Sequence, residues 1–391
     1  MRMGKRLIAC LVGVCVGLMT FARAEISVAP LEESVPVTLP CKSALLMEAG
    51  SGQIIFEKNA DEQRPVASVV KVMTILLCVE AVESGRVSLD DCVSVSKNAS
   101  GMGGSQVLLD TGETQTLDVL LKSAIVGSAN DAAVAIAEYL SGSQELFVKR
   151  MNARAEALGM KDTVFVNCTG LPATGQHTTA RDVARMSAEL FSHELYYRFS
   201  TVWMDEVDHG DGRKTQLTNT NRLIRLYDGC DGGKTGSTNE AGYCITVTAK
   251  RGDMRLIAVV LGGETGALRF EAAQKMLDHG FANYRLLALA ERGARVRGEM
   301  PVTGGKRESV PLMLNGDLRL LMNRDRTPEV ELNPQLPESV PAPVRTGDEV
   351  GSVEIVMDGR RIAEIPVVCA GDVERQGFYD AWTRAWSRWL F

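Results

Sequence analysis

Several features that define other protein classes are missing from this chain. Only 5% of its 391 residues are aromatic, no long basic run occurs, and the formal net charge is −6. This balance argues against a nucleic-acid-binding protein, and the absence of a heptad or Gly-X-Y period excludes a coiled coil and a collagen. With 45% hydrophobic residues the chain is not intrinsically disordered. Its length predicts roughly two or three domains.

Metal-binding motifs are also missing. The sequence has no Cys-x-x-Cys and no group of Cys and His with the spacing of zinc ligands. Nine Cys occur, of which Cys10 and Cys15 fall in the leader described below. The others are odd in number, so at least one has no partner within the chain. We interpret most of them as small buried hydrophobic residues.

Long apolar runs are absent except at the N-terminus. There a basic start is followed by an uncharged run from Leu7 to Phe21 and by Ala22-Arg23-Ala24. At about 1.5 Å per residue the run spans about 23 Å, which is short of the roughly 30 Å hydrocarbon core of a bilayer. We therefore predict that residues 1–24 are a secretory signal peptide and that the protein is exported.

Tryptophan is scarce, yet three of the four Trp lie among the last ten residues. At 100° per residue Trp382, Trp386 and Trp389 share one face of a helix, with Arg side chains on the other face. A helix of this length is too short to cross a membrane but suits its interface. We predict that residues 373–391 form an amphipathic helix at the membrane surface; the alternative is a terminal helix docked on its own domain.

Between the two ends, hydrophobic periodicity predicts an α+β domain over residues 25–290. Strand pairs are predicted around Gly50-Ser51-Gly52 and Arg251-Gly252-Asp253, and helices over 68–83, 116–141, 144–158, 180–192 and 268–284. This order favours a helical cluster packed on an antiparallel sheet. Further on, Asn315-Gly316 and Asp358-Gly359 each predict a hairpin turn, which indicates a small all-β domain over 291–372.

Ser68-Val-Val-Lys71 opens the first long helix, and its spacing places the Lys amine beside the Ser hydroxyl. A hydroxyl attacks poorly until a base removes its proton, and a Lys with a lowered pKa can be that base. A second copy, Ser94-Val-Ser-Lys97, lies in an alternating run that predicts a strand. We therefore assign the chemistry to the first copy.

Two later tripeptides complete a set. In Ser128-Ala-Asn130 the hydroxyl can relay a proton and the amide can hold a substrate carbonyl. The alternative is that these residues only cap the N-terminus of a helix, where Ser and Asn are common. Lys234-Thr-Gly236 precedes the strand predicted from about Gly242, and its Gly would let an extended peptide lie against the backbone. By itself this tripeptide is typical of an ordinary turn. The three motifs in this order form a known signature, in which the middle motif is usually Ser-Asp-Asn.

With these motifs the sequence resembles the serine-type D-alanyl-D-alanine carboxypeptidases, which are low-molecular-mass penicillin-binding proteins. The resemblance extends to Met151-Asn, Gly170-Leu and Thr179-Ala-Arg-Asp182 and covers about residues 40–390. It implies a β-lactamase/transpeptidase-like domain followed by the β domain and the terminal helix. It also implies no metal or cofactor, peptidoglycan stem peptides as substrates, β-lactams as inhibitors and a peripheral location on the outer face of the cytoplasmic membrane.

The resemblance also implies a role for each motif residue. Ser68 would be the acyl-ester nucleophile, Lys71 its general base and Ser128 a proton shuttle. The predicted substrate-binding residues are Asn130, Lys234, Thr235, Gly236 and Ser237, with the backbone N–H groups of Ser68 and Ser237 as the oxyanion hole. Some relatives carry an Arg shortly before the third motif, where this chain has Thr220; Arg222, Arg225 and Arg269 are nearby cations that we leave outside the predicted site.

Two other functions use similar motifs. A secreted serine β-lactamase of class A would need a Glu-x-x-x-Asn loop between the second and third motifs, and the sequence has none there. A non-enzymatic penicillin-binding sensor or scaffold of the wall would not need the intact nucleophile and lysines. D,D-endopeptidase activity would use the same machinery and stays open.

Overall fold

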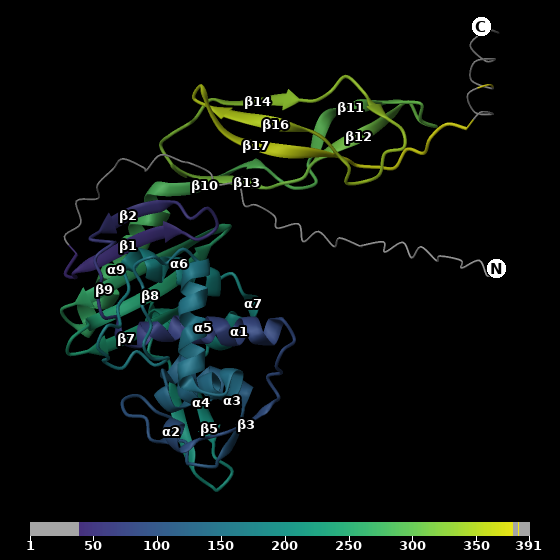
Figure 1. Ribbon diagram of the computed structural model, residues 1–391. Helices are drawn as coiled ribbons and strands as arrows, with labels where there is room; N and C mark the ends of the chain where they lie inside the picture. Colours follow the sequence, from purple (N-terminus) through teal and green to yellow (C-terminus); the bar gives the residue numbers. More distant parts are fainter. Residues whose placement is uncertain (1–38, 378–381, 383–391) are drawn as a thin grey trace, which may run out of the picture.

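The computed structural model describes residues 39–377 and Trp382. The predicted signal peptide lies outside these residues, as do residues 378–381 and 383–391 of the predicted C-terminal helix. The predicted start of that helix at residue 373 is wrong, because Val373 and Arg375 form β-bridges with Val344 and Gly305. Within the described part, no helix is both long enough and apolar enough to cross a membrane. Figure 1 shows two regions: a mixed region of helices and strands, and an elongated region built of strands.

The first region is organised around one antiparallel sheet of five strands in the order β2-β1-β9-β8-β7. Its strands are β1 (Ser43–Glu48), β2 (Ile54–Lys58), β7 (Cys230–Thr238), β8 (Gly242–Arg251) and β9 (Met254–Gly263). Both predicted hairpins are confirmed, because β1 pairs with β2 and β8 pairs with β9. The edge strand β7 carries the third motif.

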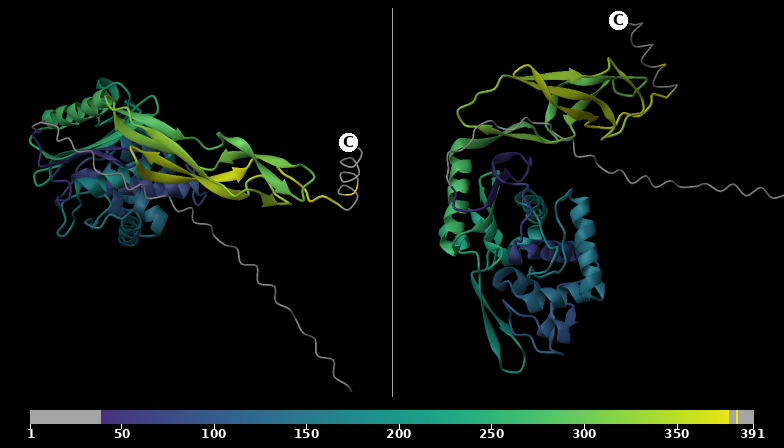
Figure 2. Two further views of the ribbon diagram at one scale, coloured as in Figure 1. Left: turned by 90° about the horizontal axis from the view of Figure 1, so that it is seen from above. Right: turned by 60° about the vertical axis from the view of Figure 1, so that its left-hand side comes forward.

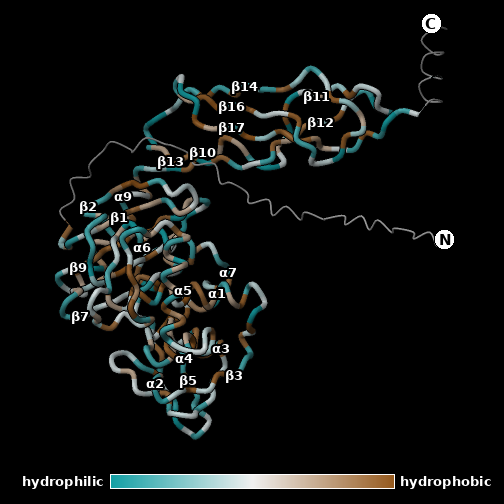
Figure 3. The backbone as a smooth tube through the Cα atoms, in the orientation of Figure 1, coloured by the Kyte–Doolittle hydropathy of each residue, from teal (hydrophilic) through white to brown (hydrophobic). Residues whose placement is uncertain are grey.

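Helices cover both faces of this sheet. The helices of this region are α1 (Lys71–Glu83), α2 (Lys97–Ser100), α3 (Leu117–Lys122), α4 (Asn130–Ser141), α5 (Gln144–Ala157), α6 (Ala180–Leu190), α7 (Glu194–Ser200), α8 (Leu223–Leu226) and α9 (Gly266–Asn283). Helix α9 packs on one face, and α6 lies on the other together with the rest of the helical cluster. Alternation along β9 explains the layering: Ile257 and Val259 join the core of the helical cluster, whereas Ala258 and Val260 pack with α9. Figure 3 shows hydrophobic segments concentrated in the interior of this region.

The helix predicted over 116–141 is interrupted. After α3, the π-helical turn η2 (Ser123–Gly127) ends at Ser128, which has a left-handed φ of 61°. The chain then re-enters a helix at Asn130. Hydrophobic periodicity did not predict this break, because the segments before and after it are both amphipathic or buried. The break changes the backbone direction at Ser128, so that its side chain does not follow the periodicity of either helix.

The remaining small strands flank the helical cluster. Strands β3 (Cys92–Ser94) and β4 (Thr114–Thr116) form one two-stranded sheet, and β5 (Met204–Asp208) and β6 (Lys214–Thr218) form another. Strand β3 overlaps the strand predicted from the alternating run around Ser94, although that run ends in helix α2 at Lys97. Strands β4, β5 and β6 and helix α7 were not predicted from the sequence. The cysteine prediction is confirmed: all seven described Cys are unpaired, and only Cys92 is exposed.

The second region is all-β, as predicted. Its strands are β10 (Tyr284–Ala290), β11 (Arg295–Thr303), β12 (Ser309–Leu314), β13 (Leu318–Asn323), β14 (Val330–Gln335), β15 (Val340–Pro341), β16 (Glu349–Met357) and β17 (Arg360–Cys369). The Asp358-Gly359 hairpin is confirmed as β16–β17. The hairpin predicted at Asn315-Gly316 is wrong, because β12 pairs with β11 and β17 while β13 pairs with β10.

The two regions are joined covalently and by contacts. Helix α9 runs directly into β10, and both views in Figure 2 show the all-β region extending from that end of the molecule. Leu321 of β13 is buried in the core beneath α9, and its backbone N–H donates to Gln53 Oε1 at 2.7 Å. The β1–β2 turn of the first region therefore binds strand β13 of the second region.

Candidate active site

Ser68 lies in a strained turn immediately before the first long helix. The 3₁₀ turn η1 (Ala67–Val70) contains it, and Ala67 has a φ of 50°, which is uncommon for a residue with a side chain. Gly170 lies directly against this turn: a Cβ there would come within 2.0 Å of the Ala67 carbonyl oxygen. The backbone at Gly170 thus fixes the position of the nucleophile.

Lys71 is fully buried beside Ser68, as the spacing predicted. Its Nζ donates to Ser68 Oγ at 2.9 Å and to the carbonyl oxygen of Thr169 at 2.7 Å. Burial lowers the pKa of Lys71 from 10.5 to about 7, against the opposing influence of Cys168 and Asp131. At neutral pH a substantial share of this amine is therefore uncharged and able to take a proton.

The Thr169 carbonyl was not predicted as part of the site, yet its loop is tightly held. Thr74, one turn along α1, donates to the carbonyl oxygen of Cys168 at 2.7 Å. Asn167 Oδ1 accepts from the backbone N–H of Gly170 at 2.7 Å. The one signal in the sequence was Gly170-Leu, which the resemblance included without giving it a role.

Ser128 and Lys234 meet although they are far apart in the chain. Lys234 Nζ donates to Ser128 Oγ at 2.7 Å and to the carbonyl oxygen of Thr235 at 3.0 Å, and both side chains are buried. Burial lowers the pKa of Lys234 well below its usual value, and the charge of Lys71 adds to the effect. The two lysines therefore share one site. Since the Ser128 oxygen accepts from Lys234, its own hydrogen is available to a third group.

Asn130 begins α4 and is buried with one polar atom unused. Its Nδ2 donates to the carbonyl oxygen of Gly103 at 2.6 Å, whereas Oδ1 has no hydrogen-bond partner among the described residues. A buried amide oxygen without a partner is costly unless a ligand supplies one. Asn130 therefore has an unused acceptor for a substrate N–H, and the second hydrogen of its Nδ2 stays available to donate to a substrate carbonyl, as predicted.

The third motif precedes the strand predicted from about Gly242, which is β8, and the motif itself lies in strand β7, which was not predicted. Thr235 is buried and its Oγ1 donates to Thr220 Oγ1 at 2.8 Å, whereas Ser237 is exposed. A Cβ on Gly236 would lie 2.7 Å from the Ser68 nitrogen and 2.7 Å from the Val66 carbonyl oxygen. The missing side chain thus admits the nucleophile turn against β7, which corrects our expectation that it makes room for a peptide.

Arg269 is a buried cation that the predicted site omitted. It lies in α9, far along the chain, and its Nη1 donates to the carbonyl oxygens of Gly236 at 3.2 Å and Cys244 at 3.1 Å. Its Nε has no partner among the described residues. Sequence distance from the third motif hid this residue, because only the packing of α9 beside β8 brings it there.

The second Ser-x-x-Lys copy is confirmed to be unrelated to the site. Ser94 ends strand β3, and Lys97 begins the short helix α2. Ser96 is the N-cap of that helix and accepts from the Ala99 N–H at 3.0 Å. In this arrangement Ser94 and Lys97 do not share a helix face.

A cluster with metal-ligand residue types occurs elsewhere in the first region. Among the described residues, Glu80, Glu189 and His193 bring their ligand atoms within 4.8 Å of one another. Arg154, however, pairs with Glu80 at 2.7 Å and with Glu189 at 2.6 Å. We interpret the cluster as an ion-pair network that ties α1, α5 and α6 together.

Comparison with known proteins gives two family matches. Residues 30–265 match the model of the D-alanyl-D-alanine carboxypeptidases, and residues 284–375 match that of the penicillin-binding protein 5 C-terminal domain. The chain is also similar to the D-alanyl-D-alanine carboxypeptidase DacF of Bacillus subtilis, at 37% identity over 386 residues. That match covers 98% of this chain and 99% of the relative.

Solved structures give the same result. Penicillin-binding protein 5 of Haemophilus influenzae superimposes with a TM-score of 0.74 at 30% identity, over 87% of this chain and 99% of the other. Penicillin-binding protein D2 of Listeria monocytogenes, in an ampicillin-bound form, superimposes with a TM-score of 0.56 at 32% identity. This second match covers 63% of this chain and 100% of the other.

The packing of η1 on β7 generates a prediction. In Gly236→Ala the new methyl group would displace the Ser68 backbone, so we expect the rate of acylation by a labelled penicillin to fall roughly 10- to 100-fold. Gly371→Ala, whose Cβ would have only ordinary contacts at 3.7 and 3.8 Å, is the control and should react at the normal rate. Normal acylation of folded Gly236→Ala would show that the close approach is not needed.

Proposed function

The chain belongs to the family of D-alanyl-D-alanine carboxypeptidases, and from this premise we propose how its own residues carry out the reaction. It is a serine hydrolase whose family forms a covalent acyl-enzyme and binds β-lactams. The observation that carries our assignment is the 2.9 Å contact between the buried Lys71 amine and Ser68 Oγ. The proposal concerns the residues, the substrate-binding mode and the location.

Acylation would begin when uncharged Lys71 takes the proton of Ser68. The present contact then reverses, so that Ser68 O–H donates to Nζ while Nζ continues to donate to Thr169. Ser68 Oγ attacks the carbonyl carbon of the penultimate D-Ala, and the oxyanion forms beside the backbone N–H groups of Ser68 and Ser237. The close approach of Gly236 to the Ser68 nitrogen supports this placement of the two donors.

Ser128 would deliver a proton to the departing amine. Its oxygen accepts from Lys234 at 2.7 Å, which orients its hydrogen away from Lys234. When the C–N bond breaks, the terminal D-Ala leaves with this proton, and the acyl group stays on Ser68 as an ester. The proton that Lys71 took from Ser68 would replace the one that Ser128 gives up, so that both groups return to their starting state. Water then attacks the ester, which releases the shortened peptide and restores the Ser68 hydroxyl.

The terminal carboxylate of the substrate would bind at the third motif. Thr235 offers a hydroxyl, and Lys234 and Arg269 offer positive charge from either side of β7. A carboxylate here would raise the pKa of Lys234 again, because it favours the charged amine. The unused Oδ1 of Asn130 would accept an N–H from the peptide on the other side of the scissile bond.

The whole-length relatives favour a carboxypeptidase over the two alternatives. A match to DacF over 98% of this chain includes the all-β region, which a secreted β-lactamase does not require. The buried pairs of Ser68 with Lys71 and of Ser128 with Lys234 retain a complete catalytic set, which a sensor or scaffold does not require.

A single substitution tests the nucleophile. We expect Ser68→Ala to lose covalent labelling by a labelled penicillin and to lose release of D-Ala from a stem pentapeptide, because no other hydroxyl contacts Lys71 in the described residues. Gel fluorescence and a D-Ala assay measure the two activities on wild type and variant. Labelling of the variant at the wild-type level would refute the assignment, and rapid penicillin turnover by the wild type would indicate a β-lactamase.

The pKa of Lys71 predicts the pH profile of acylation. Below about 7 most of the amine is protonated, so the rate should rise about tenfold per pH unit and then level off above pH 7. Stopped-flow measurement of penicillin acylation between pH 5 and about 9 gives this profile. Lys97→Ala, in the second Ser-x-x-Lys copy, should leave the profile unchanged. A rate independent of pH across this range would rule out Lys71 as the base.

We also propose where the enzyme acts. Residues 1–24 would direct export, residues 25–290 would form the catalytic domain, and 291–372 would form a β domain that spaces it from the membrane. The part of the predicted C-terminal helix that follows residue 377 would hold the protein at the outer face of the cytoplasmic membrane, where peptidoglycan stem peptides are present. The Trp face of that sequence and the elongated all-β region support this arrangement.

The location can be tested on the mature protein. Deleting residues 376–391 should abolish sedimentation with anionic phospholipid vesicles while D-Ala release continues, because the site lies entirely in the first region. A full-length variant with Trp382, Trp386 and Trp389 replaced by Ala should behave like the deletion. Continued sedimentation of the truncated protein would contradict the anchor.

A further inference from the structure

A pocket adjoins the third motif on the side where the leaving group would depart. It has a volume of about 940 Å³ and is lined by Trp203, Thr220, the arginines 222, 225 and 269, and Phe270, among others. Two contacts join it to β7: Thr220 Oγ1 accepts from Thr235, and Arg269 donates to the carbonyl oxygen of Gly236. A group held at Thr235 therefore lies at the entrance of this pocket.

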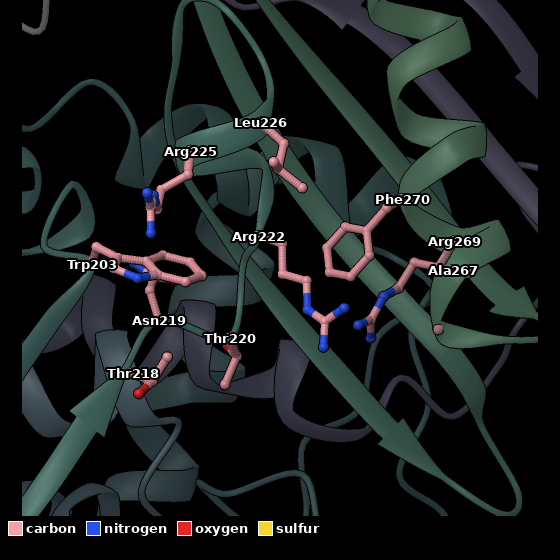
Figure 4. A pocket seen from close by; sticks show the side chains of 11 residues that line it. Trp203, Thr218, Asn219, Thr220, Arg222, Arg225, Leu226, Ala267, Arg269 and Phe270 are labelled. Carbon is pink, nitrogen blue, oxygen red and sulfur yellow. The ribbon is translucent and has the colours of Figure 1, made fainter.

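The pocket carries positive charge that no carboxylate of the described residues neutralises. Across residues 39–377, none of its three arginines forms an ion pair with a carboxylate. Figure 4 shows the guanidinium groups of Arg222 and Arg269 turned toward one another. Burial lowers the pKa of Arg269, and the charge of Arg222 adds to the effect. Two facing cations without an anion between them indicate a site for one.

Apolar surface lies beside these charges. The guanidinium carbon of Arg225 stacks 5.3 Å from the centre of the Trp203 ring, and that of Arg269 lies 4.5 Å from the centre of the Phe270 ring. Leu226, between them on α8, is 69% exposed. Stacking keeps the guanidinium planes in place while leaving their edges free to bind carboxylates.

Size argues against a single amino acid as the occupant. Pockets that enclose drug-sized ligands measure roughly 300–1,000 Å³, and this pocket lies near the upper end of that range. A terminal D-Ala has one methyl group and one carboxylate, and the latter would already be held by Lys234, Thr235 and Arg269, which leaves Arg222 and Arg225 without an anion. A leaving group that continues as a peptide would fill the remaining space and bring further carboxylates.

We propose that this pocket binds the leaving-group half of a cross-linked substrate, a second peptide that bears free carboxylates and whose amine is released. The inference rests on the proposed function, because it uses the same acylation of Ser68. The bond broken is again the amide to the D-Ala carbonyl, and the second peptide departs with the proton from Ser128. Water then hydrolyses the ester, so the pocket adds an endopeptidase specificity to the carboxypeptidase site.

Three synthetic substrates test the proposal on the full mature chain. The first ends in D-Ala-D-Ala, the second replaces the terminal D-Ala by a peptide with two additional free carboxylates, and the third has those two carboxylates amidated. We expect wild-type kcat/KM to be about tenfold higher for the second substrate than for the third. Equal values for these two would overturn the charge recognition.

Variants locate the effect. Arg222→Ala and Arg225→Ala should each lose about tenfold in kcat/KM on the free-carboxylate substrate and less than about twofold on the other two. Arg222→Lys, which keeps the charge, should retain most of the activity, and Arg297→Ala on β11 is a charge-matched control outside the pocket. An equal loss on all three substrates, or no loss on any, would overturn the proposal.

The two hypotheses fail in different ways. If the wild type releases D-Ala from the first substrate but cleaves neither of the others, the proposed function stands and the pocket does not bind a second peptide. If the wild type releases no D-Ala from the first substrate, the proposed function itself is wrong.

Discussion

The burial of the Lys71 amine is the constraint on which the rest of the site depends. Burying a charged ammonium here is costly, and the pKa of Lys71 is therefore lowered so that the amine is partly neutral. Its hydrogen bonds are made to Ser68 and Thr169. Each of these partners needs its own support. The strained turn at Ala67 requires Gly170, and the Thr169 loop requires Thr74 and Asn167. Much of the backbone around Ser68 thus keeps the Nζ atom of Lys71 buried from water and fully hydrogen-bonded.

A second buried lysine makes this arrangement responsive to substrate. The charge of Lys71 helps to lower the pKa of Lys234, and Asp131, which partly offsets the lowered pKa of Lys71, forms no ion pair with either lysine in the described residues. Its carboxylate accepts from the backbone N–H groups of Val107, Leu109 and Ala132. The anion that stabilises a protonated Lys234 is therefore expected to come from the substrate. With that charge matched, Lys71 remains the base, and the site has its full set of charges only when a carboxylate is bound.

The sequence was informative where chemistry is local and uninformative where it depends on packing. Ser68 and Lys71 are three residues apart, so helix geometry alone predicted their contact, and the turn residues predicted the β1–β2, β8–β9 and β16–β17 hairpins. Asn315-Gly316 has the composition of a hairpin turn, but the strands beside it find other partners, since pairing in a multi-stranded sheet is decided by burial across the whole domain. The break at Ser128 escaped notice because periodicity does not report a left-handed residue between two buried segments. Gly236 was identified as important for the wrong reason: its neighbour in space is the Ser68 backbone, which no pattern in the strand reveals.

Arg269 and the pocket beside it show how function is divided in this fold. In the proposed mechanism the motif residues act on the scissile bond and the carboxylate next to it, and every D-Ala amide presents these groups alike. Discrimination between one leaving group and another must therefore come from side chains beyond Thr235, in a region where no motif is required. Here the chain places the one Trp outside its C-terminal sequence, Trp203, together with arginines from α8 and α9. Because these residues come from separate elements and are joined to β7 by the hydrogen bonds of Thr220 and of the Gly236 carbonyl, we expect that Trp203, Arg222 and Arg225 can change without disturbing Ser68 or Lys71. The same catalytic residues can then act on substrates with different leaving groups, and the charge of the neighbouring pocket determines which leaving group is preferred.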